Sequence, residues 1–162
     1  MSRRYPMTHS VLFVCLGNIC RSPLAEGIFR AHVLERGLAE HFRIDSAGTG
    51  SWHAGNPPDP RSVEVAARHG IDISGQRARQ VTAEDFGTYD TILAMDRSNL
   101  TTLEDRAGSR ARNRLRLFLA DPAMDVPDPY YGGPGGFDEV FRLIQEGSEK
   151  LLDALAHRKP AS

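Results

Sequence analysis

The 162-residue sequence predicts an α/β fold, with an open four-stranded, mostly parallel sheet and helices on both of its faces. Two observations predict this class. Short apolar runs of strand length alternate along the chain with longer segments whose apolar residues recur at helical spacing. The first run, Val11–Cys15, is apolar without interruption, as expected of a parallel strand that is buried on both faces. Alternating strands and helices favour a single sheet covered by helices.

The expected elements follow in a regular order. Strands are expected over residues 11–15, 42–46, 91–95 and 115–120, and helices over residues 22–36, 60–69, 97–106 and 137–157. Ser22 can cap the first helix, and Pro23 fits its first turn, where the missing N–H of proline does no harm. Gly70 is expected to end the second helix in the left-handed conformation. Thr82 and Asp85 have the spacing of a capping box, which predicts a further short helix.

Length and composition indicate one ordinary globular domain over residues 1–162. The net charge of −1 gives no general attraction for nucleic acid or anionic lipid, so neither nucleic acid nor a membrane is an expected partner. The longest apolar run, Val11–Leu16, is too short to span a bilayer. Arg3 and Arg4 precede it, but polar residues interrupt the run before an export signal could form. With two cysteines in one short segment, we expect a cytoplasmic protein, and we expect it to be a monomer.

The segment Cys15–Pro23 carries the strongest signal for chemistry. It leads from the end of a buried strand through a short loop into a helix, and open α/β sheets bind ligands beyond such strand ends. Successive backbone N–H groups in such a loop can surround an anion, and the helix N-terminus adds to the field. Arg21 contributes a planar, permanently charged group that matches two phosphate oxygens. The same field favours the thiolate form of Cys15, which can attack phosphorus and form a phosphocysteine.

Each of these residues also has an ordinary structural interpretation. A cysteine at a strand end is usually a small buried hydrophobe, Ser22 could be only an N-cap, and Asn18 only a turn residue. Their joint occurrence, with five residues between Cys15 and Arg21, favours the phosphate-binding interpretation. Gly17 and Asn18 are also residue types that tolerate the positive φ that a tight cradle requires.

The segment Val14–Pro23 resembles the phosphate-loop signature of the low-molecular-weight protein tyrosine phosphatases. Six further segments resemble that family's motifs in the same order, namely Asp45–Gly48, Gly55–Asp59, Arg68–Ile71, Ala78–Thr82, Ala94–Asn99 and Asp128–Gly132. The resemblance implies an enzyme that hydrolyses phosphotyrosine in proteins, and small aryl phosphates, through a phosphocysteine on Cys15. It also implies phosphate and vanadate as ligands, and no cofactor.

The resemblance further implies a general acid. Tyrosinate is a poor leaving group near neutral pH, because its phenol has a pKa of about 10. Asp121, Asp125 and Asp128 lie in one loop after the last expected strand. The resemblance singles out Asp128 as the acid, and later as the base toward water. Without the resemblance, Asp128 and Pro129 are explained equally well as part of a turn.

Other residues are assigned to the site by the resemblance alone. Substrate binding is assigned to Leu16, Gly17, Asn18, Ile19, Cys20, Ser22, Trp52, Tyr130 and Tyr131, and structural support of the loop to Ser46, His69 and Asp96. Tyr130 and Tyr131 would flank a phenyl ring, whereas Trp52 is equally compatible with covering the core. Asp96 is expected to orient His69, which would otherwise be an ordinary helix terminus.

Cys20 is the second thiol of the loop. Two cysteines cannot complete a tetrahedral zinc site, and none of the six histidines stands at ligand spacing to them, so no metal is expected. The resemblance implies instead a reversible disulfide between Cys20 and Cys15 that would mask the nucleophile. The alternative is that Cys20 only packs.

Three other functions compete with the phosphotyrosine phosphatase. Arsenate reductases of similar fold need a further cysteine, and the chain has none after Cys20. A non-hydrolytic anion-binding module would not need Asp128 in its full motif. Protein-arginine phosphatases of the same family carry Thr where this chain has Ile19, and the bulkier side chain disfavours a guanidinium.

Overall fold

The computed structural model describes residues 8–111, 113–120, 123–130 and 136–156. Its centre is a four-stranded sheet in the order β2-β1-β3-β4. The strands are β1 (His9–Cys15), β2 (Phe42–Gly48), β3 (Thr91–Ala94) and β4 (Leu115–Leu117). All three strand pairs are parallel, which confirms the expected α/β sheet.

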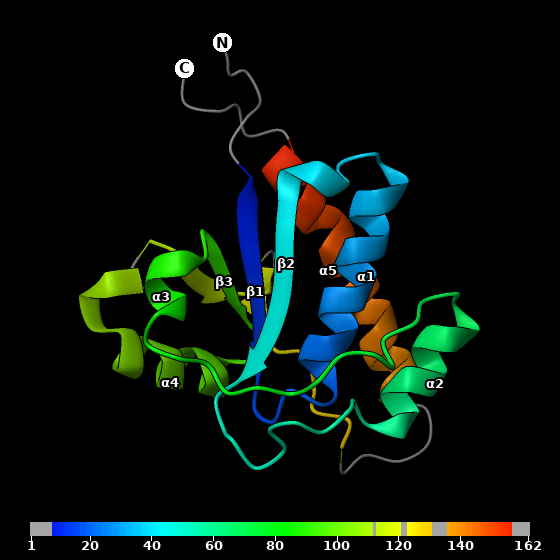
Figure 1. Ribbon diagram of the computed structural model, residues 1–162, viewed down its shortest axis with the longest axis horizontal. Coiled ribbons are helices and arrows are strands. Elements are labelled where there is room, and N and C mark those ends of the chain that lie inside the picture. Colours follow the sequence, from blue (N-terminus) through cyan, green and yellow to red (C-terminus); the bar gives the residue numbers. More distant parts are fainter. Residues whose placement is uncertain (1–7, 112, 121–122, 131–135, 157–162) are drawn as a thin grey trace.

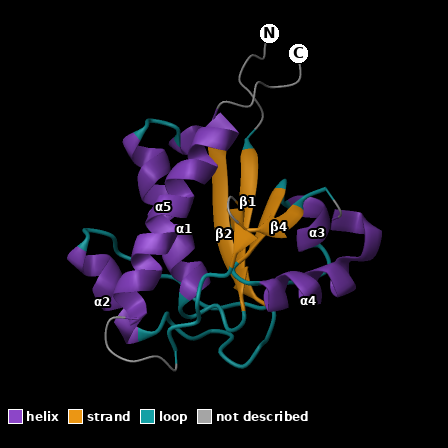
Figure 2. Cartoon of the chain, turned by 180° about the vertical axis from the view of Figure 1, so that it is seen from behind, coloured by secondary structure: helices purple, strands orange, loops and turns teal. Residues whose placement is uncertain are grey.

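Helices cover both faces of this sheet (Figures 1 and 2). The helices are α1 (Arg21–Glu35), α2 (Pro60–Arg68), α3 (Asp85–Thr88), α4 (Arg97–Ala107) and α5 (Gly136–Ala156), with 3-10 turns at Ala39–His41 and Gly108–Ala111. Figure 2 shows α1, α2 and α5 on one side of the sheet and α3 and α4 on the other. The prediction of helices on both faces is therefore confirmed.

The alternation of side chains along β1 builds a core on each side of the sheet. Phe13 points into the core beneath α1 and α5, where its ring meets the rings of Phe29 and Phe118 edge-on, at centroid distances of 5.6 Å and 5.7 Å. Leu12 and Val14 point into the opposite core, beneath α3 and α4. Because β1 is buried on both faces, its position and direction are firmly held, and so is the loop that follows it.

Two helix starts differ in detail from the expectation. Helix α1 begins at Arg21, and Cys20 at its N-cap makes no side-chain capping bond. Ser22 is therefore not the cap: it lies inside the first turn, and its hydroxyl faces Cys15. Helix α3 begins at Asp85, but the bond expected of the capping box is present, since the N–H of Thr82 donates to the Asp85 carboxylate at 2.7 Å.

Helix α2 ends as expected. Gly70 follows its last turn with a φ of +79°, a conformation that favours glycine. Helix α5 ends at Ala156, so the expected last residue, His157, lies outside the described residues.

The fourth strand is shorter than the expected range of residues 115–120. It leaves the sheet after Leu117, and Phe118 turns its ring into the core against Phe13. Leu119–Ala120 (β5) then pairs with Ala123–Met124 (β6) in an antiparallel ribbon of its own. This turn directs the chain toward the edge of the sheet where the strands end.

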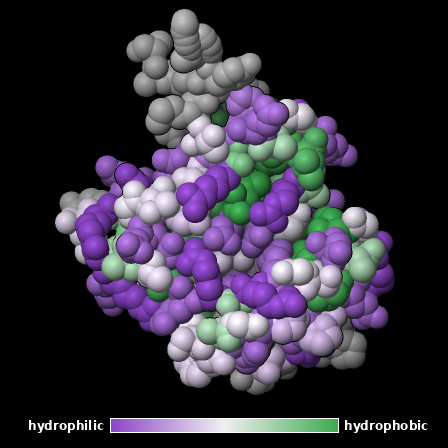
Figure 3. Space-filling model, viewed as in Figure 1, coloured by the Kyte–Doolittle hydropathy of each residue, from purple (hydrophilic) through white to green (hydrophobic). Residues whose placement is uncertain are grey.

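The face shown in Figure 3 is largely hydrophilic, with hydrophobic side chains gathered beside α1. Across residues 8–111, 113–120, 123–130 and 136–156, no helix has the length and apolar character needed to cross a membrane.

Candidate active site

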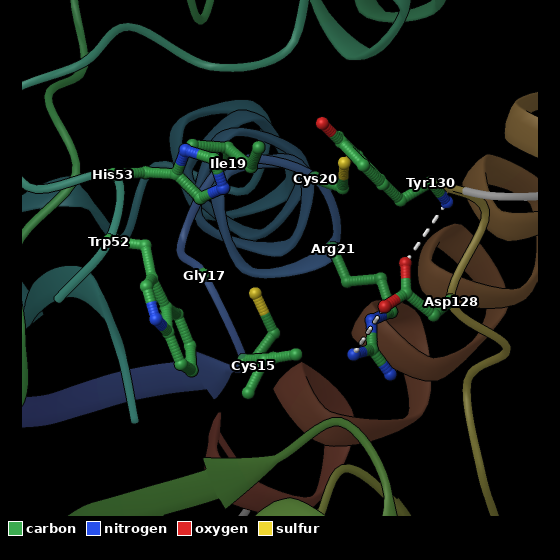
Figure 4. Close-up of a pocket in the computed structure, with 10 residues that line it drawn as sticks. Cys15, Gly17, Ile19, Cys20, Arg21, Trp52, His53, Asp128 and Tyr130 are labelled. Atoms are coloured by element: carbon green, nitrogen blue, oxygen red, sulfur yellow. Dashed lines mark hydrogen bonds and ion pairs between the residues drawn. The ribbon is translucent and has the colours of Figure 1, made fainter. Parts of the chain in front are cut away.

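The loop between β1 and α1 forms the floor of a cavity of about 330 Å³. The cavity is lined by Cys15, Leu16, Gly17, Ile19, Cys20, Arg21, Trp52, His53, Asp128 and Tyr130. Cys15 is the last residue of β1, and its sulfur points into the cavity (Figure 4). The Sγ atom lies 3.0 Å from the hydroxyl of Ser22, which stands in the first turn of α1, so the two groups can share a hydrogen bond.

Asn18 holds the loop in its curled form. Its φ of +58° is the one left-handed value found for a non-glycine among the described residues. The buried side-chain amide compensates for this strain with three bonds. Its Nδ2 donates to the hydroxyls of Ser22 and Ser46, at 2.8 Å and 3.0 Å, and its Oδ1 accepts from the N–H of Arg79 at 2.9 Å. Ser46 in turn donates to a Glu26 carboxylate oxygen at 2.7 Å.

Arg21 is almost fully buried, yet its guanidinium lines the cavity. One terminal nitrogen donates to an Asp96 carboxylate oxygen at 2.7 Å and to the carbonyl of Val126 at 2.9 Å. The other lies 3.6 Å from the Asp128 carboxylate. Burial acts to lower the pKa of Arg21, but the negative charges of Cys15, Asp96 and Asp128 outweigh it and raise this pKa above its ordinary value. The guanidinium is thus a fixed positive charge.

Asp128 reaches the cavity from the loop after β6. One carboxylate oxygen accepts the N–H of Tyr130 at 3.0 Å, which closes a small turn, and the other faces Arg21. Figure 4 shows Asp128 and Tyr130 on one side of the cavity and Trp52 and His53 on the opposite side. Trp52 is 72% exposed, so it does not cover the core, and it stands at the rim. A flat ring entering between the two sides would reach Cys15.

The two thiols of the loop have different surroundings. Burial raises the pKa of Cys20 to about 12, with smaller contributions from the negative charges of Asp59, Cys15 and Asp128. Both cysteines are free, and both line the cavity.

The structure brings most of the expected site residues together. Cys15, Arg21 and Asp128 share one cavity with Leu16, Gly17, Ile19, Cys20, Trp52 and Tyr130, and Asn18, Ser22 and Ser46 form the network behind it. Tyr131, assigned to substrate binding, lies outside the described residues.

The expected support of the loop by His69 needs correction. The His69 ring lies exposed at the end of α2 and stacks on Phe141 of α5, with centroids 4.0 Å apart. Asp96 does not orient it: one Asp96 oxygen accepts from Arg21, and the other caps α4 by accepting the N–H of Asn99. The position of His69 follows from the packing of α2 against α5, which its place in the sequence does not reveal.

Three residues of the site were not expected from the sequence. Glu26 lies one turn into α1 and binds Ser46, His53 lines the cavity beside Trp52, and Arg79 donates to Asn18. A buried glutamate on the inner face of α1 is the one signal that could have been noticed, because carboxylates are rarely buried without a partner.

Comparison with known proteins agrees with this geometry. Residues 10–161 match the family described as low molecular weight phosphotyrosine protein phosphatase. The low molecular weight protein-tyrosine-phosphatase YfkJ of Bacillus subtilis is 46% identical over 154 residues, which cover 93% of this chain and 97% of YfkJ. The crystal structure of YfkJ aligns with a TM-score of 0.87 at 45% identity over 92% of this chain and 95% of its own.

Two further solved structures are also similar. A protein tyrosine phosphatase of Entamoeba histolytica, crystallised with Hepes in its active site, aligns with a TM-score of 0.88 at 36% identity over 92% of this chain and 97% of its own. A Drosophila arginine phosphatase aligns with a TM-score of 0.83 at 35% identity over 92% of this chain and 99% of its own.

Proposed function

The chain belongs to the low molecular weight phosphotyrosine protein phosphatase family, and we propose that it hydrolyses phosphotyrosine in proteins with Cys15 as nucleophile. The observation that carries the proposal is the placing of the Cys15 sulfur, the Arg21 guanidinium and the Asp128 carboxylate around one cavity. A thiolate, a fixed cation and a carboxyl group are the three parts that cleavage of an aryl phosphate needs.

The first step forms a phosphocysteine. The phosphoryl oxygens lie in the loop, held by its backbone N–H groups and by Arg21, while the Cys15 thiolate attacks phosphorus. The bond between phosphorus and the phenolic oxygen breaks as the S–P bond forms. Asp128, in its protonated form, gives its proton to the leaving oxygen. Arg21 supports this step because its position is fixed by Asp96 and Val126.

The second step releases phosphate. Asp128, now a carboxylate, takes a proton from water as the water oxygen attacks phosphorus. The S–P bond breaks and returns the thiolate of Cys15, which the Ser22 hydroxyl at 3.0 Å can stabilise by donating a hydrogen bond. Asn18 holds that hydroxyl in place, because its Nδ2 donates to the Ser22 oxygen at 2.8 Å and leaves the hydroxyl hydrogen available for the sulfur.

The rim supports an aryl substrate. Trp52 and Tyr130 stand on opposite sides of the cavity (Figure 4), where each can contact a phenyl ring for about 1 kcal/mol beyond simple burial. We further propose that inorganic phosphate and vanadate bind in the loop as competitive inhibitors.

One assay panel tests the function and its rivals. Phosphotyrosine, phosphoserine and phosphoarginine peptides are compared, together with arsenate and a thiol donor. We expect hydrolysis of phosphotyrosine, complete loss in Cys15→Ser, and capture of phosphotyrosine proteins by that variant. Faster hydrolysis of phosphoarginine would favour the activity in the name of the Drosophila relative. Ile19, which lines the cavity, supports the opposite outcome.

We also propose a redox switch in the loop. Peroxide would oxidise the Cys15 thiolate to a sulfenic acid, and the Cys20 thiol would displace water from it to form a disulfide. Both sulfurs line the same cavity, which supports this step. Peptide mass mapping after mild peroxide should find the Cys15–Cys20 linkage, and dithiothreitol should restore activity. A Cys15 oxidised only to sulfinic acid would refute the switch.

Finally, we propose that residues 1–162 form one phosphatase domain that acts as a monomer in the cytoplasm. The family match over residues 10–161 supports one domain, and two free thiols suit a reducing compartment. Sedimentation of the purified protein would test the monomer.

A further inference from the structure

A cluster of charged side chains lies behind the loop and does not line the cavity. Arg79 donates to both oxygens of Asp85, at 2.9 Å and 3.2 Å, and to Asp45 at 3.2 Å. Tyr89 donates its hydroxyl to the same Asp45 oxygen at 3.0 Å. A guanidinium held by two carboxylates has little freedom, because the planar fork fixes its direction.

This charged cluster fixes a stretch of backbone. The stretch is residues 78–81, which Figure 1 shows between α2 and α3, crossing the end of the sheet near the loop. The carbonyl of Arg79 accepts the N–H of Gly48 at 2.8 Å, and the N–H of Val81 donates to the Gly48 carbonyl at 2.8 Å. Residues 78–81 are therefore tied to the end of β2 by backbone bonds and to α3 by the Arg79 side chain.

The same stretch supplies the remaining bond of Asn18. The Asn18 Nδ2 donates to two serine hydroxyls, and its Oδ1 accepts the N–H of Arg79. Without that N–H, a buried carbonyl oxygen on the strained residue would lose its partner. The cluster also reaches the network at a second point, since Asp45 Oδ1 accepts the N–H of Ser46 at 2.9 Å.

We propose that Arg79 is a positioning residue for the phosphatase reaction, a role that rests on the proposed function. Asp45 and Asp85 fix the Arg79 guanidinium, the backbone N–H of Arg79 fixes Asn18, and Asn18 fixes the Ser22 hydroxyl against Cys15. Arg79 does not line the cavity and bonds to the loop itself at Asn18, so we expect most of its effect on Cys15 to pass through Asn18. The charges of Asp45 and Asp85 outweigh the effect of burial and raise the pKa of Arg79, so its cation persists throughout the pH range of any assay.

The test is a double-mutant cycle with p-nitrophenyl phosphate. Arg79→Ala keeps the backbone N–H but frees it, so kcat should fall roughly tenfold while KM changes little. Asn18→Ala should lower kcat further. Because Arg79 acts through Asn18, the double variant should match Asn18→Ala alone. Arg79→Lys, which can still pair with one carboxylate, should recover part of the activity. Arg142→Ala, which removes two surface ion pairs of α5, is the matched control and should leave kcat unchanged.

Two outcomes overturn the proposal. Either Arg79→Ala retains the wild-type kcat, or the two single losses multiply in the double variant. If Arg79→Ala does not fold, Asp85→Asn provides the same cycle with a smaller change. The rate at which iodoacetate alkylates Cys15 distinguishes a failure of this proposal from a failure of the proposed function, because alkylation does not require phosphatase activity. Even if the wild-type protein hydrolysed no phosphate ester, a correct proposal requires slower alkylation of Cys15 in Arg79→Ala, and a double variant that is alkylated at the same rate as Asn18→Ala alone.

Discussion

The two thiols of the loop have different surroundings. Cys15 faces the cavity with the Ser22 hydroxyl 3.0 Å from its sulfur, and it contributes to the raised pKa of Arg21 as a negative charge. Cys20 sits at the N-cap of α1, where burial raises its pKa to about 12. Since the thiolate is the reactive form of cysteine, the raised pKa of Cys20 makes this residue unreactive near neutral pH.

Alkylation should therefore distinguish the two residues. At a pH of about 6, iodoacetate should modify Cys15 at least tenfold faster than a free thiol, because the loop N–H groups and Arg21 favour the thiolate. Cys20 should remain unmodified. The measurement is peptide mass mapping over time, with inorganic phosphate as the control that should protect Cys15. Equal labelling of both cysteines would contradict this difference.

The general acid can be tested by its dependence on the leaving group. Asp128→Asn should slow phosphocysteine formation from phosphotyrosine by roughly 10²- to 10⁴-fold, the usual contribution of a positioned acid. The loss should be smaller for p-nitrophenyl phosphate, because a more acidic phenol needs less protonation. Single-turnover kinetics with both substrates measures the difference.

Asp125→Asn is the control from the same loop. Asp125 accepts the backbone N–H of Arg97 at 3.0 Å and so anchors the loop to α4. Any loss of rate in Asp125→Asn should be equal for phosphotyrosine and p-nitrophenyl phosphate. If the loss of rate in Asp128→Asn were also equal for the two substrates, Asp128 would not be the acid.

For single residues, the sequence predicts a site best where its residues are close together along the chain. Cys15, Asn18, Arg21 and Ser22 were found because one short loop holds them all. Glu26 and Arg79 were missed because their roles depend on contacts between distant segments, with Ser46 and with Asn18. The same reason explains the error at His69, whose neighbour is set by the packing of α2 on α5.

Among the elements, the start of α4 connects the fold to the site. Asp96 at its N-cap uses one carboxylate oxygen for the N–H of Asn99, at 2.7 Å, and the other for Arg21, at 2.7 Å. One side chain thus stabilises a helix and orients the cation of the cavity. The two roles can be separated, because serine can cap a helix but cannot pair with a guanidinium.

Asp96→Ser and Asp96→Ala form the matched pair for this separation. Both variants remove the carboxylate from Arg21, so both should lower kcat by roughly 10- to 100-fold through misorientation of the guanidinium. Only alanine also removes the cap, so Asp96→Ala should be less stable than Asp96→Ser by about 1 kcal/mol. Kinetics and urea unfolding measure the two effects. Equal stability of the two variants would show that the cap contributes little.

The strand boundaries show the limit of pattern reading for elements. The segment 115–120 predicts one strand, but the chain leaves the sheet at Phe118, whose ring packs edge-on against Phe13. Residues within one apolar run can pack on different layers, and periodicity does not distinguish these cases. The start of a helix is equally hard to predict. Ser22 is a residue type that often caps helices, but it lies inside the first turn and its hydroxyl faces the sulfur of Cys15.

Across the whole molecule, charged groups define a window of stability. The Arg61 side chain lowers the pKa of Asp59 by hydrogen bonding, and bonds from Arg79 and Thr82 outweigh burial and lower that of Asp85. Such carboxylates stabilise the fold fully above their unfolded pKa of about 4, and this contribution is lost as the pH falls through their lower folded values. Stability should therefore be constant near neutral pH and should decline in acid.

Cys20 contributes to the alkaline limit of this window. Its folded pKa is raised from 9.0 to about 12, so the folded state keeps a proton that the unfolded chain releases in between. The stabilisation is complete below 9.0 and is lost as the pH rises toward 12. Over that interval, the free energy of unfolding should fall by about 1.4 kcal/mol per pH unit for this single group.

Replacing the thiol tests this assignment. Cys20→Ala has no proton to release, so its free energy of unfolding should fall less steeply between pH 9.0 and 12 than that of the wild type. At neutral pH the variant is expected to be less stable, because a buried sulfur is lost. The measurement is urea unfolding across this range under reducing conditions. Tyr89→Phe is the control. Burial also raises the pKa of Tyr89, so this variant measures how much the phenol contributes to the loss of stability at alkaline pH. If Cys20→Ala and the wild type lost stability in parallel, the alkaline limit would belong to Tyr89 or to another group, and Cys20 would be only a packing residue.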